Sequence, residues 1–212
     1  MRALLLFSTC LTLLTLSACA TMTADQCAAA DWQAVGYEDA MEGRAASHLQ
    51  QHIAACTDHG ITANETNYMA GHTQGATAFC TPTNGFKQGI GGKPNTNICP
   101  DDLANAFSVT YEAGRGLYTR KRAVTQAEND LATLERRMQA LETSISNNEN
   151  AIATLGLSQA NRSQVQAQLN ADRSEHQRLS KQRKRAQEQV RRTEGDYDRY
   201  RTRVEDEFFQ GS

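Results

Sequence analysis

The stretch AENDLATLERRMQALETSISNNENAIATLG, residues 127–156, decides the fold of the second half of the chain. Its apolar or small residues recur at alternating spacings of four and three, which is the a/d seam of a coiled coil. The seam residues are Ala127, Leu131, Leu134, Met138, Leu141, Ile145, Asn148, Ile152 and Leu155. This pattern predicts one long helix with a narrow apolar face.

A second seam follows after a short interruption. Gly156 is a stop signal for the first helix, and Ser158 is a suitable N-cap for the next one. The spacing of four and three then resumes at Val165 and continues to Phe208. Because a short loop makes two such helices antiparallel neighbours, the sequence predicts a helical hairpin over residues 119–212 with its turn near 156–158. At 1.5 Å per residue, an arm of about fifty residues spans about 75 Å.

Folding the hairpin about residues 156–157 predicts which side chains face one another. Tyr200 is expected beside Ala113, and Phe208 beside Asn105. The same register brings five basic residues to one level, namely Arg120, Lys121, Arg122, Arg191 and Arg192. Such a band can attract an anionic partner, for example a lipid phosphate or a peptidoglycan carboxylate. The alternative is a solvated face balanced by nearby carboxylates.

The middle of the second arm is polar even on its seam. Asp172, His176 and Arg183 occupy positions that coiled coils normally fill with apolar side chains. We therefore expect this arm to be less stable alone, and we hypothesise that a partner or oligomerisation completes it.

The chain opens with the features of a secretory signal. Arg2 precedes an apolar run that is too short to span a bilayer and that ends in small residues. Residues 16–19 read Leu-Ser-Ala-Cys, which resembles the lipobox of bacterial lipoproteins. We expect residues 1–18 to be removed and Cys19 to carry lipid, since more than one acyl chain gives stable membrane attachment. An ordinary secretory signal with an incidental cysteine is the alternative.

The resemblance to lipoproteins also implies a location. In Gram-negative lipoproteins, a residue other than Asp directly after the lipidated cysteine, here Ala20, favours the outer membrane. We therefore expect the protein on the periplasmic face of the outer membrane. Nucleic acid is not an expected partner outside the cytoplasm.

Four cysteines remain once Cys10 leaves with the signal and Cys19 takes lipid. They are Cys27, Cys56, Cys80 and Cys99. An even number of cysteines in an oxidising compartment predicts two disulfides, and three pairings are open. Each bridge is expected to contribute about 3 to 4 kcal/mol.

Histidines are the weak candidates for a metal site. His48 and His52 lie four residues apart and share a face of a predicted helix, with His59 and His72 further along. Zinc clusters place their thiolates two to four residues apart, whereas these cysteines are widely spaced and expected to be oxidised. The histidines are therefore expected to serve in packing or capping, with no metal and no cofactor.

Carboxylates give little support for an enzyme. The dense cluster of Glu38, Asp39 and Glu42 lies on one stretch of predicted helix, so a solvated face is the expectation. Glycoside hydrolysis needs two opposed carboxylates in a cleft. The sequence also holds no phosphate-binding Gly-rich loop and no GxSxG motif. We assign no catalytic residue.

The composition changes along the chain. Residues 19–118 hold ten acidic and four basic side chains, whereas residues 119–212 hold fourteen and seventeen. All three prolines and most glycines lie before residue 117. We therefore expect a compact, acidic head over residues 19–118, followed by the hairpin.

The head contains a degenerate repeat in which an aromatic residue precedes small residues at helical spacing. Its units are Tyr37-x2-Ala40-x2-Gly43, Tyr68-x2-Gly71-x3-Gly75, Phe86-x2-Gly89-x-Gly91 and Tyr111-x2-Gly114-x-Gly116. Positions i, i+3 and i+7 share a helix face, so the first two units predict a stripe on which another helix packs closely. In the third unit, residues 89–92 are instead expected to be turn residues that need positive φ.

These motifs together resemble a known family. The strings DWQAVGYEDAMEGRAAS, HIAAC, YMAGHTQGATAFC, NGFKQGIGG and NICP are similar to the proteobacterial lipoprotein family called domain of unknown function 2799. The resemblance covers residues 27–118 and departs from the family pattern at Ala40 and Phe79. It implies a small, disulfide-linked domain of the cell envelope, and it implies no activity.

The sequence thus predicts an all-α protein with a disulfide-linked helical head and a long antiparallel coiled-coil hairpin. The function that we expect is that of a non-enzymatic outer-membrane lipoprotein, with a hairpin that reaches toward peptidoglycan or a partner protein. Binding of a metal or small ligand by the head histidines is the alternative, and an envelope hydrolase is the third and least supported class.

Overall fold

The computed structural model describes residues 22–153 and 156–208. The predicted signal over residues 1–18 and the lipid site at Cys19 lie outside these residues. Every regular element in the described part of the chain is a helix, which confirms the all-α prediction. None of these helices is both long enough and apolar enough to cross a membrane.

The chain forms two compact units. Unit 1 contains the described residues up to Phe79 together with Thr96–Pro100, and unit 2 contains Cys80–Asn95 together with the residues from Asp101 onward. The second part of the predicted head therefore folds with the hairpin and not with the first part. The reason is that the helix after Cys80 packs on the helix that begins at Asp101.

Unit 1 is built from short helices with clear end signals. They are α1 (Ala24–Ala29), α2 (Trp32–Met41), a 3-10 turn (Ala46–His48), α3 (Leu49–Thr57) and α4 (Glu65–Phe79). The Asp31 carboxylate accepts from the first backbone N–H groups of α2, and the Asn64 side chain accepts from the Asn67 N–H at the start of α4. Gly60 has a φ of +71° just after α3. These residues supply the hydrogen bonds and the backbone conformation that are typical of helix ends.

Helices α2 and α4 pack backbone to backbone. A Cβ on Gly36 would lie 2.1 Å from the Tyr68 carbonyl oxygen, and a Cβ on Gly71 would lie 1.8 Å from the Gln33 carbonyl oxygen. No side chain fits in such a gap, so the predicted small-residue stripe is confirmed for the second repeat unit. In the first unit only Ala40 lies in this contact, against Gly75, because Gly43 follows the end of α2 with a φ of +77°. The contact offsets the roughly 1 kcal/mol that a helical glycine costs relative to alanine.

A disulfide closes the core of unit 1. Cys27 of α1 is bonded to Cys56 of α3. The buried residues around this bridge are Met22, Trp32, Leu49 and Tyr68. Cys80 and Cys99 are also disulfide-bonded, so the prediction of two bridges is confirmed.

Unit 2 starts with a second helix pair. Helix α5 (Pro82–Ile90) packs on the first part of α6 (Asp101–Ala153), and Gly89 and Gly114 lie in backbone contact across this pair. The prediction that Gly89 is a turn residue was wrong, because this glycine makes the same close helix contact as those of unit 1. The turn itself follows α5 at Gly92, with a φ of +70°.

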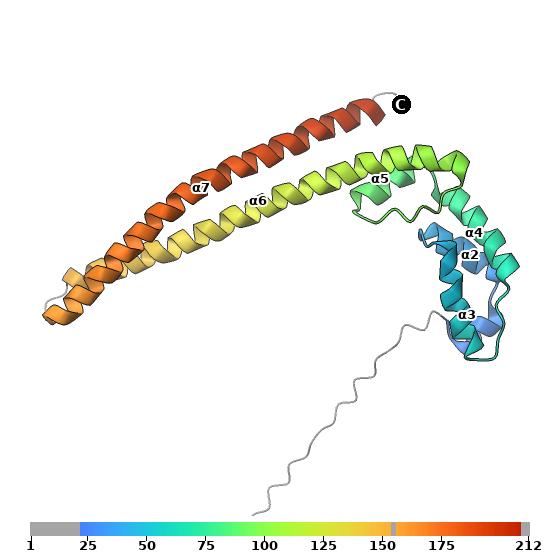
Figure 1. Ribbon diagram of the computed structural model, residues 1–212, viewed down its shortest axis with the longest axis horizontal. Helices are drawn as coiled ribbons and strands as arrows, with labels where there is room; N and C mark the ends of the chain where they lie inside the picture. The colour runs from blue at the N-terminus through green and yellow to red at the C-terminus, as the bar shows by residue number, and fades with distance from the viewer. Residues whose placement is uncertain (1–21, 154–155, 209–212) are drawn as a thin grey trace, which may run out of the picture. The chain divides into compact units, whose positions relative to one another are not determined.

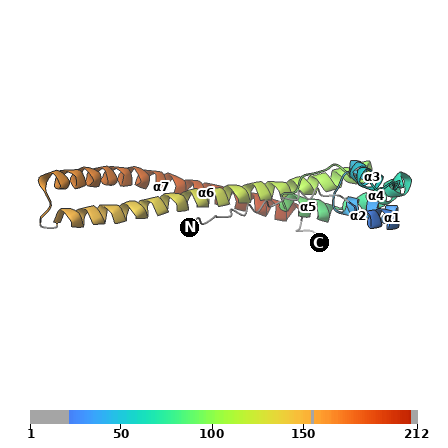
Figure 2. The same ribbon diagram turned by 90° about the horizontal axis from the view of Figure 1, so that it is seen from below.

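The hairpin consists of α6 and α7 (Gln159–Phe208), which run side by side in opposite directions (Figures 1 and 2). Gly156 has a φ of +103°, and the Ser158 hydroxyl accepts from the Asn161 N–H at the start of α7. Both roles had been predicted from the sequence. Helix α6 is continuous from Asp101 through the predicted boundary at residue 119.

The register of the hairpin differs from the predicted one by about one helical turn. Tyr200 lies against Gly116, where a Cβ would be 2.3 Å from the phenol oxygen, and not against Ala113. Val204 packs with Ala113 and Leu117. Counting from the loop failed because the register depends on where a large ring finds room, and Gly116 provides that room.

Candidate functional site

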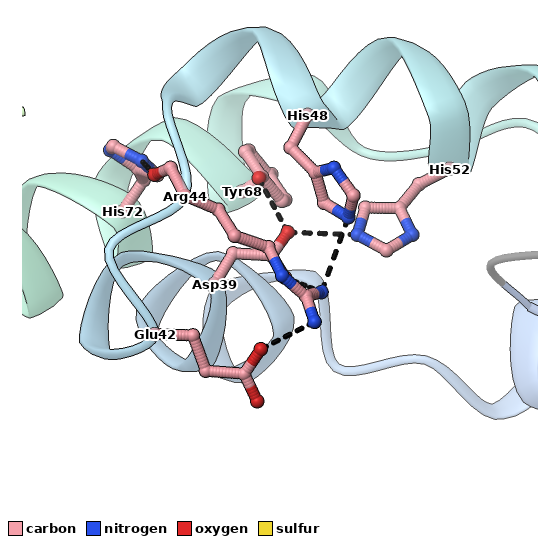
Figure 3. Close-up of polar contacts among 7 residues, drawn as sticks. All are labelled: Asp39, Glu42, Arg44, His48, His52, Tyr68 and His72. Carbon is pink, nitrogen blue, oxygen red and sulfur yellow. Dashed lines mark hydrogen bonds and ion pairs between the residues drawn. The ribbon is translucent and has the colours of Figure 1, made fainter. Parts of the chain in front are cut away.

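A buried carboxylate, Asp39 of α2, is surrounded by polar side chains (Figure 3). Its side chain is only 5% exposed. The Tyr68 hydroxyl from α4 donates to Oδ2 at 2.7 Å, and Nε2 of His52 from α3 lies 2.8 Å from the same oxygen. Because these residues come from three helices, the contacts also tie α2, α3 and α4 together.

Arg44, just after α2, occupies the other side of the carboxylate. Its Nη1 atom lies 2.9 Å from Asp39 Oδ1 and 3.2 Å from His48 Nε2. Its Nη2 atom pairs with the exposed Glu42 carboxylate. The backbone oxygen of Arg44 is 2.9 Å from His72 Nε2. The guanidinium therefore lies between one carboxylate oxygen and one imidazole nitrogen.

These contacts shift the pKa values of Asp39, His48 and Tyr68. Burial raises the pKa of Asp39, but hydrogen bonds from Tyr68 and His52 and the nearby histidine charges outweigh it and hold that pKa below its ordinary value. Burial lowers the pKa of His48, and the charges of Arg44 and His52 lower it further against the opposing Asp39. Burial and the bond to Asp39 raise the pKa of Tyr68. At neutral pH the cluster thus holds an ionised carboxylate, a neutral His48 and a protonated phenol.

The cluster has the composition of an open metal site. One potential ligand atom each from Asp39, His48 and His52 lies within 4.8 Å of the other two. Asp39, Arg44 and His52 also line a cavity of about 430 Å3. Within the described residues, Nδ1 of His52 is buried and has no hydrogen-bond partner.

The prediction that Asp39 lies on a solvated face with Glu38 and Glu42 is wrong, because Asp39 is buried. The side chain is buried because it shares its helix face with Gly36 and Ala40, which contact or approach α4. That periodicity was visible in the sequence and could have revealed the carboxylate. The partnership with Tyr68 could not be predicted, since it depends on how α4 crosses α2.

The four histidines that were considered together do not form one group. His48 and His52 meet at Asp39, as their spacing had suggested. His72 instead stacks on Tyr68 and reaches the Arg44 backbone. His59 is exposed and follows the end of α3.

The five basic residues proposed as an anionic-partner patch are not brought to one level. Arg120 pairs with Asp196 at 3.0 Å and lies over the Tyr200 ring. Arg191 and Arg192, further along α7, both pair with Glu188.

Lys121 and Arg122 remain near each other within unit 2. They line a groove of about 840 Å3 with Arg115, Tyr118 and Tyr197. Binding of an anionic partner here stays a prediction.

Along the hairpin, the α7 seam is polar in part, although its Leu169 and Leu179 are buried. On α6, five seam side chains are only half-buried, namely Leu131, Leu134, Leu141, Ile145 and Ile152. Opposite them on α7, Asp172 is buried and accepts hydrogen bonds from Ser144, Asn148 and Gln168. Further along, His176 pairs with Glu142. The predicted polar middle of the second arm thus leaves the apolar side of α6 incompletely covered.

Comparison with known proteins identifies part of the chain. No curated protein and no solved structure matches it. Residues 31–116 match the family model described as "Protein of unknown function (DUF2799)", which confirms the resemblance inferred from the sequence motifs. Over these residues, the chain is therefore similar to the DUF2799 family.

Proposed function

We propose that this chain is a non-enzymatic outer-membrane lipoprotein whose hairpin binds a helix of a partner protein in the cell envelope. Two disulfides support an oxidising compartment. The lipobox-like sequence at residues 16–19 supports attachment through Cys19. The hairpin supplies the surface for the partner.

The observation that carries this proposal is the mismatch between the two seams. In an isolated two-helix hairpin, apolar a and d side chains are covered when the facing helix is also apolar. Here Leu134 and Ile145 stay only half-buried, while the facing α7 buries the polar Asp172. A third helix with an apolar stripe would cover the exposed side of the seam, as in helical bundles.

The partner's chemistry follows from the same surface. It needs an amphipathic helix with apolar residues at positions i, i+3, i+4 and i+7, because that spacing matches the α6 seam. Its flanking charges would face a mixed surface, on which Arg173 pairs with Glu149 and Arg137 with Glu175. Apolar burial rather than net charge is therefore expected to drive binding, and the interaction should be weakly dependent on salt.

Site-specific photo-crosslinking in intact cells tests the proposal. A photoreactive phenylalanine analogue replaces Leu134 on the seam, and in a matched strain it replaces Arg136, two residues away on the opposite side of the helix. We expect an adduct with a second envelope protein from position 134 and none from position 136.

A second substitution makes the result specific to the seam. Leu141→Glu places a charge one heptad further along the apolar face and is expected to abolish the adduct formed from position 134. Thr143→Glu, on the exposed face of the same turn, is expected to leave it unchanged. Equal adducts from positions 134 and 136 would contradict the proposal. An adduct made only of two copies of this chain would mean that the hairpin binds a second copy of itself and not a partner protein.

A further inference from the structure

We propose that Asp39, His48 and His52 form a binding site for a divalent transition-metal ion of the zinc type, and that the Arg44 guanidinium holds this position when no ion is bound. The inference is independent of the hairpin and its partner. It concerns unit 1 alone.

The donor set suits such an ion. One carboxylate oxygen and two imidazole nitrogens are ligands that zinc and its neighbours accept, whereas calcium and magnesium prefer oxygen alone. The three potential ligand atoms lie within 4.8 Å of one another. Zinc binds such atoms at about 2.0–2.2 Å, so ligands around a tetrahedral ion are about 3.3–3.5 Å apart. Closure of the site therefore requires side-chain movements of about 1 Å.

The Arg44 guanidinium occupies the position proposed for the metal ion. Since a guanidinium only donates, the Nε2 atom of His48 at 3.2 Å must accept from it, so its lone pair points toward the positive group. Asp39 Oδ1 faces the same Nη1 atom at 2.9 Å. A metal ion in this position would meet the same two lone pairs.

Arg44 can leave without great cost. Its side chain is 44% exposed, and its second contact is with Glu42, which is 59% exposed. Ion pairs with such exposure contribute little to stability. The side chain can therefore swing into solvent together with Glu42 when an ion takes its place.

Two further features prepare the site. The Tyr68 hydroxyl holds Asp39 Oδ2, so the carboxylate is oriented with Oδ1 toward Arg44 and His48, and metal ligands are commonly fixed by such hydrogen bonds. Independently, the His52 side chain is 6% exposed, and its Nδ1 atom has no partner among the described residues. His52 also lines the cavity of about 430 Å3.

Calorimetric titration of the oxidised full-length protein, purified without a polyhistidine tag, tests the inference with Zn2+. We expect one equivalent to bind. His48→Gln should weaken binding by about 10- to 100-fold or more, because even groups that only support a metal ligand contribute that much. His48 is half-exposed, so this variant should keep its fold, which the fluorescence of the single buried Trp32 reports. His59→Gln, in the same unit but in the exposed turn after α3, should bind as the parent does.

Arg44→Gln separates this inference from nonspecific histidine binding. Removal of the competing guanidinium should tighten Zn2+ binding, and NMR signals of the His48 and His52 ring nitrogens should shift together on addition of one equivalent. The inference is overturned if no stoichiometric binding occurs, if His59→Gln weakens binding as much as His48→Gln, or if Arg44→Gln weakens it.

Discussion

Gly71→Ala tests the backbone contact that positions the Asp39 cluster. The added Cβ would lie 1.8 Å from the Gln33 carbonyl oxygen and 2.7 Å from its carbonyl carbon. Neither atom can yield as the end of a flexible side chain could, so α2 and α4 must move apart by more than 1 Å. This movement also stretches the 2.7 Å hydrogen bond from Tyr68 to Asp39, which joins the same two helices.

The expected loss of stability is the sum of opposing effects. Overpacking a close helix contact costs about 1–3 kcal/mol. Weakening a buried hydrogen bond to a charged group costs about 1.5–3 kcal/mol. Alanine has a higher helix propensity than glycine, which stabilises the variant by about 1 kcal/mol. We therefore expect the free energy of unfolding of unit 1 to fall by about 2 to 4 kcal/mol.

Urea denaturation measures this change through Trp32, the single tryptophan of the chain, which is buried in unit 1. Gly195→Ala is the matched control, because this glycine lies within α7 and a Cβ there would meet only the flexible end of Arg199, at 3.2 Å. That variant should stabilise unit 2 by about 0.5–1 kcal/mol, as followed by circular dichroism. If Gly71→Ala left the Trp32 transition unchanged, the close contact between α2 and α4 would be refuted.

Three further predictions concern pH, the disulfide and the hairpin register. The pKa of His48 in the folded state lies below its unfolded value of about 6.5, so the unfolded state binds more protons. Stability should therefore fall as pH drops from about 7 through 6.5. His48→Gln should make the melting temperature less dependent on pH in that window. Replacing Cys27 and Cys56 by serine should lower the free energy of unfolding of unit 1 by about 3.5 kcal/mol, because the bridge closes a loop of 29 residues. A loss below about 1 kcal/mol in urea denaturation would contradict a stabilising role of this disulfide. Tyr200→Ala removes a ring that lies on Gly116 and whose centroid is 3.9 Å from the Arg120 guanidinium carbon. Chemical denaturation should show that unit 2 loses about 3 kcal/mol of stability. Almost no change would mean that the ring is not packed there.

The fold class was predictable because the hairpin repeats one simple pattern many times. Each heptad of residues 127–156 adds evidence for the same helix, and Gly156 and Ser158 supply the end and the start on either side of the turn. The register was not predictable from the loop alone. It depends on a specific fit between Tyr200 and Gly116, and a spacing rule contains no information about the size of the facing residue.

The candidate site was predictable only in part. The spacing of His48 and His52 placed two imidazoles on one face, and the glycine stripe showed that α2 packs closely on a neighbour. Asp39 was misplaced because a carboxylate next to Glu38 and Glu42 resembles a solvated face by composition. Burial of a charge depends on partners from other helices, here Tyr68 and His52, and such partners become visible only when those helices are assembled.

The most direct test of the account is intact and peptide mass spectrometry of the protein extracted from the cells that make it. We expect that residues 1–18 are absent, that Cys19 carries acyl chains, and that Cys27, Cys56, Cys80 and Cys99 contain no free thiol. An uncleaved leader, or four free thiols in protein prepared under alkylating conditions, would contradict an exported, lipid-anchored envelope protein.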